Sequence, residues 1–271
     1  MNDTSRCAPV VETDRLTRRF GALCAVDELT LTVKPGEALG LLGRNGAGKT
    51  TAIKMLATLL PPTSGRATVA GFDIVNDAGS VRRAIGYVPQ ALSADGDLTG
   101  YENLLVFAKL YDLPRAERTS RIRDALAFME LSEFGDKLVK TYSGGMIRRL
   151  EIAQSTLHRP QVLFLDEPTV GLDPIARATV WTLVERLRSE YRSAVLLTTH
   201  YLDEAEQMCD RVAIMSRGRV TAIGSTRELA ARVRPGATFE DAFEHFTRDE
   251  ARSEGSYDEI SQTRRTSQRL G

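Results

Sequence analysis

The segment that most constrains the fold is residues 43–50, which reads GRNGAGKT and fits the pattern G-x-x-x-x-G-K-[ST]. An apolar run, EALGLLG (37–43), precedes it, and a helical pattern, KTTAIKMLATLL (49–60), continues as far as Pro61-Pro62. Short apolar runs are typical of strands buried on both faces, and proline stops a helix. The sequence therefore predicts a glycine-rich turn that joins a buried strand to a helix, as in α/β folds.

The residue types of this turn suit a phosphate ligand. Glycines allow several backbone N–H groups to converge on phosphate oxygens, and the following helix directs its positive end at the anion. Lysine in the seventh position places a charge near the β and γ phosphates, and the hydroxyl after it can bind Mg²⁺. The alternative is a chance match in a glycine-rich turn, which the flanking strand and helix disfavour. The residues predicted to bind the nucleotide here are Gly43, Arg44, Asn45, Gly46, Ala47, Gly48, Lys49, Thr50 and Thr51.

Two further apolar runs end in polar residues. VLFLDEP (162–168) places Asp166 and Glu167 at the carboxyl end of a predicted strand, where ligands of open α/β sheets bind. Asp166 can hold hydrated Mg²⁺, and Glu167 can polarise an attacking water. His200 follows AVLLTT, so we expect it at the same edge, near the γ-phosphate or the water. The alternatives are a solvated turn for the acidic pair and a structural role for a single histidine.

The rest of the chain alternates strand and helix patterns, which favours a mostly parallel sheet surrounded by helices. A helical texture from about residue 98 to 131 indicates a helical insertion over about 91–160. Strands are predicted at 29–33, 67–71, 85–90, 194–200 and 211–224, and helices at about 175–191 and 202–208. The two other histidines, His158 and His245, lack a strand-end position and are interpreted as structural.

Composition excludes several classes of protein. Lys+Arg and Asp+Glu both number 36, so the formal net charge is zero and no nucleic-acid partner is expected. Cys7, Cys24 and Cys209 show no metal-binding spacing and are interpreted as reduced cytosolic thiols. The N-terminus lacks the apolar core of a signal peptide. No apolar run approaches 18 residues, so the chain is not expected to cross a membrane by itself.

The ordered set of motifs resembles that of ATP-binding subunits of ABC transporters along residues 8–225. Gln90 in GYVPQ resembles the glutamine loop, YSGGM (142–146) the family signature, GLDP (171–174) the D-loop, and His200 the switch histidine. The segment RFGALCAVDELTL resembles the one whose aromatic ring, here Phe20, stacks on adenine. Three positions depart from the usual pattern: Tyr142 replaces Leu, Met146 replaces Gln, and Phe20 replaces Tyr.

The resemblance implies an α/β fold: a RecA-like P-loop NTPase core with a mostly parallel sheet and an N-terminal antiparallel β portion. It places a helical subdomain between Gln90 and the signature. Residues 8–225 would form the nucleotide-binding domain, 226–248 a short C-terminal helical extension, and 249–271 a charged tail that we expect to be disordered.

The resemblance also implies the cofactors ATP and Mg²⁺ and a second copy of the chain. Each ATP would lie between the phosphate loop of one copy and the signature of the other. The signature and D-loop residues that contact the nucleotide would be Ser143, Gly144, Gly145 and Asp173. Glu167, His200 and Gln90 would be catalytic, and Thr50, Gln90 and Asp166 would hold the metal.

A multi-span membrane permease is the other implied partner, docked on the helices near 98–131, so we expect the chain at the cytoplasmic face of the membrane. TYSGGMIRRLEIAQ and LATLLPPTSG resemble daunorubicin-resistance-like exporter ATPases, which predicts export of drugs, antibiotics or related hydrophobic compounds. Export of polysaccharide or lipid is the alternative cargo.

Soluble ATPases of the same type, acting on DNA ends or ribosomes, form another class. Only 52 residues separate Gln90 from Ser143, too few for the coiled coil of DNA-repair members, and one ATPase half argues against ribosome-acting members. The signature and D-loop argue against a P-loop kinase.

Overall fold

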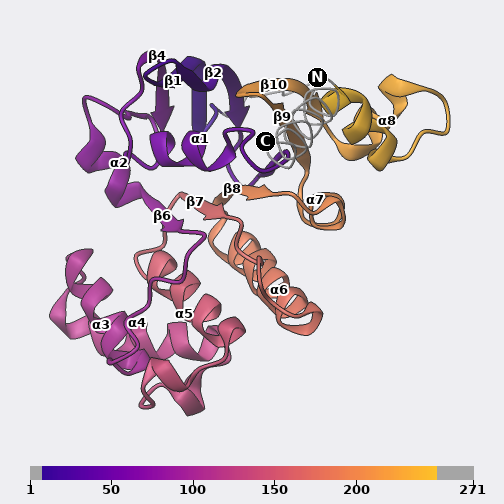
Figure 1. The fold of residues 1–271 in the computed structure, drawn as a ribbon. Helices are drawn as coiled ribbons and strands as arrows, with labels where there is room; N and C mark the ends of the chain where they lie inside the picture. Colours follow the sequence, from indigo (N-terminus) through magenta and orange to yellow (C-terminus); the bar gives the residue numbers. More distant parts are fainter. Residues whose placement is uncertain (1–7, 249–271) are drawn as a thin grey trace, which may run out of the picture.

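The computed structural model describes residues 8–248 and contains two sheets (Figure 1). The predicted tail at 249–271 lies outside the described residues. The first sheet is antiparallel and has the strand order β2-β1-β4-β5. Its strands are β1 (Val11–Phe20), β2 (Leu23–Val33), β4 (Ser64–Val69) and β5 (Phe72–Asp73).

The second sheet has six strands in the order β10-β9-β3-β8-β7-β6. All of its neighbouring pairs are parallel except β9 and β10, which form an antiparallel hairpin. The predicted mostly parallel core and its antiparallel N-terminal portion are thereby confirmed. The strands are β3 (Ala38–Leu42), β6 (Ile85–Val88), β7 (Val162–Asp166), β8 (Ala194–Thr199), β9 (Arg211–Ser216) and β10 (Arg219–Gly224).

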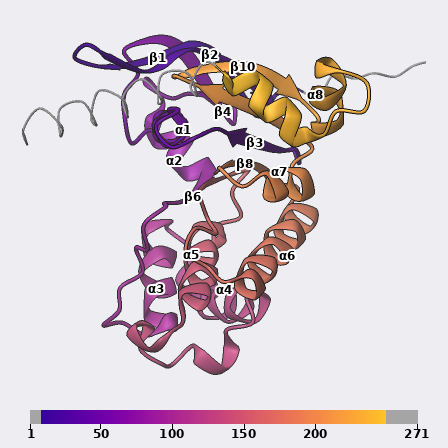
Figure 2. The ribbon, with the colours of Figure 1, turned by 45° about the vertical axis from the view of Figure 1, so that its right-hand side comes forward.

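The helices differ in what they pack against. Helix α1 contacts strands of both sheets, whereas α3, α4 and α5 lie together beyond β6 and away from the antiparallel sheet (Figures 1 and 2). No helix within residues 8–248 is long and apolar enough to cross a membrane. The helices are α1 (Lys49–Leu56), α2 (Ala78–Ala84), α3 (Gly100–Leu110), α4 (Arg115–Phe128), α5 (Gly144–Thr156), α6 (Pro174–Tyr191), α7 (Leu202–Met208) and α8 (Thr226–Val233).

Alternation along the central strands divides the core into two layers. In β8, Leu196 packs towards α1 and the antiparallel sheet, whereas Val195 and Leu197 pack towards the helical region. Phe164 and Leu163 of β7 divide in the same way, as the two-residue period of a strand requires. The carboxyl ends of these strands therefore lie between two packed layers. This packing fixes the position of the residues that follow each strand.

Two elements differ from the sequence patterns. The helix predicted at 49–60 ends at Leu56, because Thr58 takes a left-handed backbone (φ 61°) that cannot continue a helix. The apolar pattern at 211–224 is a hairpin, turned by Arg217 (φ 49°) and Gly218 (φ 83°). Residues 239–248 are helical and pack with α8 on β9 and β10.

Candidate nucleotide site

The phosphate loop lies between β3 and α1, as the sequence predicts. Gly48 has φ 102°, and a Cβ there would collide with the Ala25 carbonyl oxygen, so only glycine fits. A Cβ at Gly43 would collide with the backbone of β9 in the same way. The buried Lys49 Nζ donates hydrogen bonds to the carbonyl oxygens of Gly43 (2.7 Å) and Arg44 (3.2 Å), which fixes the ammonium inside the turn.

Asp166 ends β7 with its side chain 1% exposed. Its Oδ1 accepts hydrogen bonds from the Thr50 hydroxyl (2.9 Å) and the Thr198 hydroxyl (2.7 Å). The carboxylate is thus tied to the start of α1 on one side and to β8 on the other. Thr50 of the phosphate loop and Asp166 of the acidic strand, both predicted to hold the metal, therefore lie in contact. Their contact does not by itself test whether a metal binds there.

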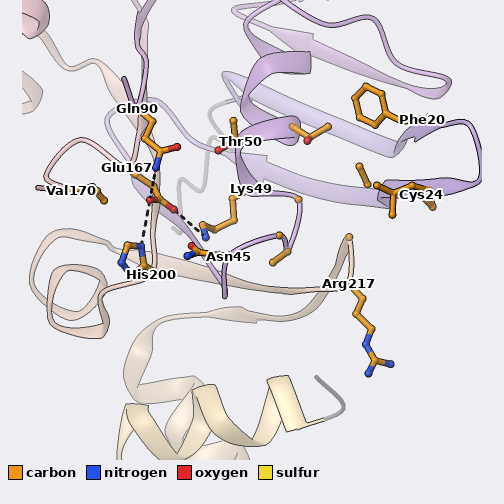
Figure 3. A pocket seen from close by; sticks show the side chains of 17 residues that line it. Phe20, Cys24, Asn45, Lys49, Thr50, Gln90, Glu167, Val170, His200 and Arg217 are labelled. Atoms are coloured by element: carbon orange, nitrogen blue, oxygen red, sulfur yellow. Dashed lines mark hydrogen bonds and ion pairs between the residues drawn. The ribbon is translucent and has the colours of Figure 1, made fainter. Parts of the chain in front are cut away.

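Glu167 is the point where the three predicted catalytic residues meet. Its Oε2 lies 3.2 Å from Gln90 Nε2 and 3.4 Å from His200 Nδ1, and its Oε1 lies 3.3 Å from Lys49 Nζ (Figure 3). The backbone of Glu167 is left-handed (φ 47°), and its N–H donates to the Thr198 hydroxyl at 2.8 Å. Such strained backbone clusters at functional sites, because the surrounding structure must impose it.

A cavity of about 890 Å³ opens above these residues. Phe20, 46% exposed at the end of β1, lies on the opposite side of Lys49 from Glu167, with the Arg18 guanidinium 4.6 Å from its ring centre (Figure 3). The predicted residues 45–51 and 90 also line it. Sequence reasoning did not single out six further lining residues: Leu23, Cys24 and Ala25 lie in the segment quoted for Phe20, and Val170, Arg217 and Gly218 carry no signal beyond the turn-forming Arg-Gly.

The signature and D-loop residues lie outside the lining of this cavity and cap two neighbouring helices. The Ser143 hydroxyl accepts the Met146 N–H at the start of α5 (3.3 Å), and Asp173 accepts two N–H groups at the start of α6. A Cβ on Gly145 would come within 2.8 Å of the Ala176 Cβ, so glycine is needed where the helix starts meet. Gly144 lies at the same helix start.

The unusual first residue of the signature has a packing role. Tyr142 is buried, its hydroxyl donates to the Phe134 carbonyl at 2.6 Å, and its ring meets the Phe134 ring edge-on. Burial raises the pKa of the phenol. Met146 packs against the same apolar cluster. Both departures from the usual signature therefore face the helical region.

A buried carboxylate lies behind the site. Glu204 of α7 is 3% exposed and accepts hydrogen bonds from the Trp181 indole (3.2 Å), the Thr199 hydroxyl (2.7 Å) and the Thr169 hydroxyl. Thr199 immediately precedes His200, and Thr169 follows the acidic strand end. One side chain thus ties together the segments that carry Glu167 and His200.

The oxygen donors present fit Mg²⁺. Thr50 and Gln90 line the cavity, and the Asp166 carboxylate lies 2.9 Å from the Thr50 hydroxyl; hydroxyl, carboxylate and amide oxygens are the hard ligands that Mg²⁺ prefers. Residues 8–248 contain no group of three or more His, Cys, Asp or Glu side chains arranged to hold a metal. This set suits an ion that retains several waters and is shared with phosphates.

The family model described as ABC transporter matches residues 26–170. The chain belongs to the ABC transporter family. It carries the ATPase domain of this family. The resemblance inferred from the motifs is thereby confirmed.

Relatives and solved structures agree with this family assignment. The daunorubicin/doxorubicin resistance ATP-binding protein DrrA of Streptomyces peucetius is 47% identical over 81% of this chain and 66% of its own length. The linearmycin resistance ATP-binding protein LnrL of Bacillus subtilis is 37% identical (83% and 72%), and the Nod factor export ATP-binding protein I of Ralstonia nicotianae is 42% identical (82% and 68%). A structure titled "ATP binding subunit of ABC transporter" superposes with a TM-score of 0.78 at 29% identity, covering 88% of this chain and 99% of that one.

Proposed function

We propose that the chain is the ATP-binding and ATP-hydrolysing subunit of an exporter, and that it powers a separate membrane-spanning partner. The observation that carries the proposal is the arrangement around Glu167, whose carboxylate contacts Lys49, Gln90 and His200 beside the cavity. A general base, a phosphate-binding cation and a polar pair are the parts that hydrolysis of a γ-phosphate needs.

The nucleotide would span the cavity from Phe20 to Glu167. The exposed Phe20 ring offers a face to adenine, and the backbone of the phosphate loop surrounds the phosphates. Thr50, Asp166 and Gln90 would hold Mg²⁺, which would neutralise phosphate charge. Glu167 accepts the proton of the attacking water, which Gln90 and His200 orient.

The signature would act on a neighbouring copy's nucleotide. Ser143 and the glycines after it lie at the N-terminus of α5, outside the lining of the chain's own cavity. A helix N-terminus presents unpaired N–H groups and a partial positive charge, which suit a γ-phosphate. Two copies arranged head to tail would therefore complete two sites, with Asp173 at the same interface.

The partner and cargo are proposed from the relatives' names. Proteins named for daunorubicin, doxorubicin and linearmycin resistance favour a drug or antibiotic as the exported compound. The ATPase would then work at the cytoplasmic face of the membrane, bound to a multi-span permease through its helical subdomain, without a nucleic-acid partner. Affinity purification of the chain from detergent-solubilised membranes should recover a multi-span protein.

Glu167→Gln tests the catalytic assignment. The variant should bind ATP normally, lose about 10²–10⁴-fold in turnover, as removal of a general base does, and form an ATP-dependent dimer in light scattering. Glu185→Gln, an exposed glutamate on α6, is the matched control and should hydrolyse ATP at the parent rate. Near-normal hydrolysis by Glu167→Gln would remove this residue from its role.

Ser143→Arg tests the trans arrangement. A large cation at the start of α5 should abolish the ATP-bound dimer in the Glu167→Gln background while nucleotide binding by the monomer persists. A dimer that survives this change would refute the proposed position of the signature.

A further inference from the structure

A buried arginine of the signature helix holds the backbone around Gln90. Arg148, on the second turn of α5, is 1% exposed. Its Nη1 donates to the Pro89 carbonyl and its Nη2 to the Gln90 carbonyl, both at 2.7 Å. The fixed fork of a guanidinium suits two adjacent acceptors, which a lysine could not serve in this way. The carbonyl groups before and after the Gln90 Cα therefore both accept hydrogen bonds from a side chain of α5.

Glu151, three residues further along α5, holds the other end of the same loop. Its Oε1 accepts hydrogen bonds from the Ser93 hydroxyl (3.1 Å), the Ala94 N–H (3.3 Å) and the Ser93 N–H. Its Oε2 lies 2.9 Å from Arg148 Nη1. Arg148 therefore donates to carbonyl oxygens of the loop, and Glu151 accepts from its N–H groups. The two opposite charges also neutralise each other.

Stability alone does not account for this pair. Both side chains are about 2% exposed, and removing two charges from water costs about as much as their mutual attraction returns, so this attraction alone gives the pair no advantage over apolar side chains of similar volume. Burial lowers the pKa of Arg148, which reflects that cost. What apolar side chains could not do is bind the backbone of 89–94.

We propose that Arg148 and Glu151 are positioning residues for Gln90, which make the loop 89–94 move with the signature helix. Ser143 begins the same helix five residues before Arg148, so a displacement of α5 by the neighbouring copy's nucleotide reaches the Gln90 amide and its contact with Glu167. The inference rests on the proposed function, because it gives Gln90 and Ser143 the roles described above.

The test is a double-mutant cycle with Gln90→Ala. Arg148→Met and Glu151→Met are combined, so that neither charge is left buried alone. Turnover is followed by phosphate release from radiolabelled ATP, which also resolves slow hydrolysis. The pair of changes should lower kcat between about tenfold and the 10²-fold that a 1 Å misplacement can cost, with KM for ATP within about twofold of the parent. In the Gln90→Ala background it should have no further effect, since the effect acts through Gln90.

Unchanged kcat in the double variant, or an equal loss with and without Gln90, would overturn the proposal. If the double variant does not fold, Glu151→Gln, which keeps the shape of the side chain, is combined with Gln90→Ala in the same double-mutant cycle. Arg149→Met is the matched control: Arg149 adjoins Arg148 but donates to the carbonyl of Met129, the residue that follows α4 (3.0 Å), and its loss should leave kcat within about twofold. Failure of the proposed function is recognised separately, by normal hydrolysis in Glu167→Gln.

Discussion

Mild acid should destabilise this protein through His158. The imidazole stacks on the Tyr111 ring with 3.7 Å between centroids, and its Nε2 donates to the Ile85 carbonyl at the start of β6 (3.0 Å). Burial lowers the pKa of His158 from 6.5 to about 4. The folded protein therefore holds this imidazole neutral at pH values where the unfolded chain protonates it.

Linkage between protonation and folding gives the sign and the size of the change in the free energy of unfolding. As the pH falls below about 6.5 the unfolded chain binds a proton that the folded protein does not, so the free energy of unfolding decreases until about pH 4. The loss attributable to His158 is about 2 kcal/mol at pH 5 and about 3 kcal/mol below pH 4. Above pH 7 the His158 imidazole is neutral in the folded and in the unfolded protein, and it no longer makes the stability depend on pH.

Urea unfolding of the parent and of His158→Gln at pH 7.5, 6 and 5 measures this loss. The carboxylates titrate in both proteins, so the difference between their free energies of unfolding isolates the histidine. His158→Gln should be the less stable protein at pH 7.5, because it loses the ring stack. That deficit should shrink by about 2 kcal/mol at pH 5. Parallel curves would refute the account of a buried neutral imidazole.

Three substitutions test the packing of the site. Gly48→Ala should abolish binding of a fluorescent ATP analogue, because its Cβ meets the Ala25 carbonyl; tight binding would contradict this. Gly145→Ala, whose Cβ would lie 2.8 Å from a Cβ of α6, should retain ATP binding but lower turnover at least about tenfold, and parent-like turnover would disprove the helix contact. Tyr142→Phe removes one of the two donors to the Phe134 carbonyl, the other being the Lys137 N–H (2.8 Å), and should cost about 1 kcal/mol in urea unfolding; an unchanged midpoint would show that this bond is dispensable.

Motifs with strict spacing could be located from sequence because their chemistry is local. The phosphate loop requires glycine at particular turns, and the ends of apolar strands place Asp166, Glu167 and His200 at one edge of the sheet. The nucleotide contacts assigned to these residues, and those of Ser143 and Asp173 across an interface, remain predictions.

Charged residues inside helices were the part that sequence could not resolve. Arg148, Glu151 and Glu204 occur in polar stretches that look solvent-facing, and no periodicity distinguishes a buried ion from an exposed one. Their burial depends on what packs against the helix, which is tertiary information. Tyr142 was unexplained for the same reason, since its acceptor, the Phe134 carbonyl, lies in a short turn without a sequence signal.

The hydrogen bond from Trp181 to Glu204 gives the protein a built-in optical probe. Trp181 is the only tryptophan in the chain, and its indole is 6% exposed. The carboxylate it contacts also binds Thr199 beside His200. Because indole emission responds to a neighbouring charge, a shift of His200 or of α7 should alter the fluorescence of the unlabelled protein. Nucleotide-driven rearrangement can thus be followed in real time at a single, known position.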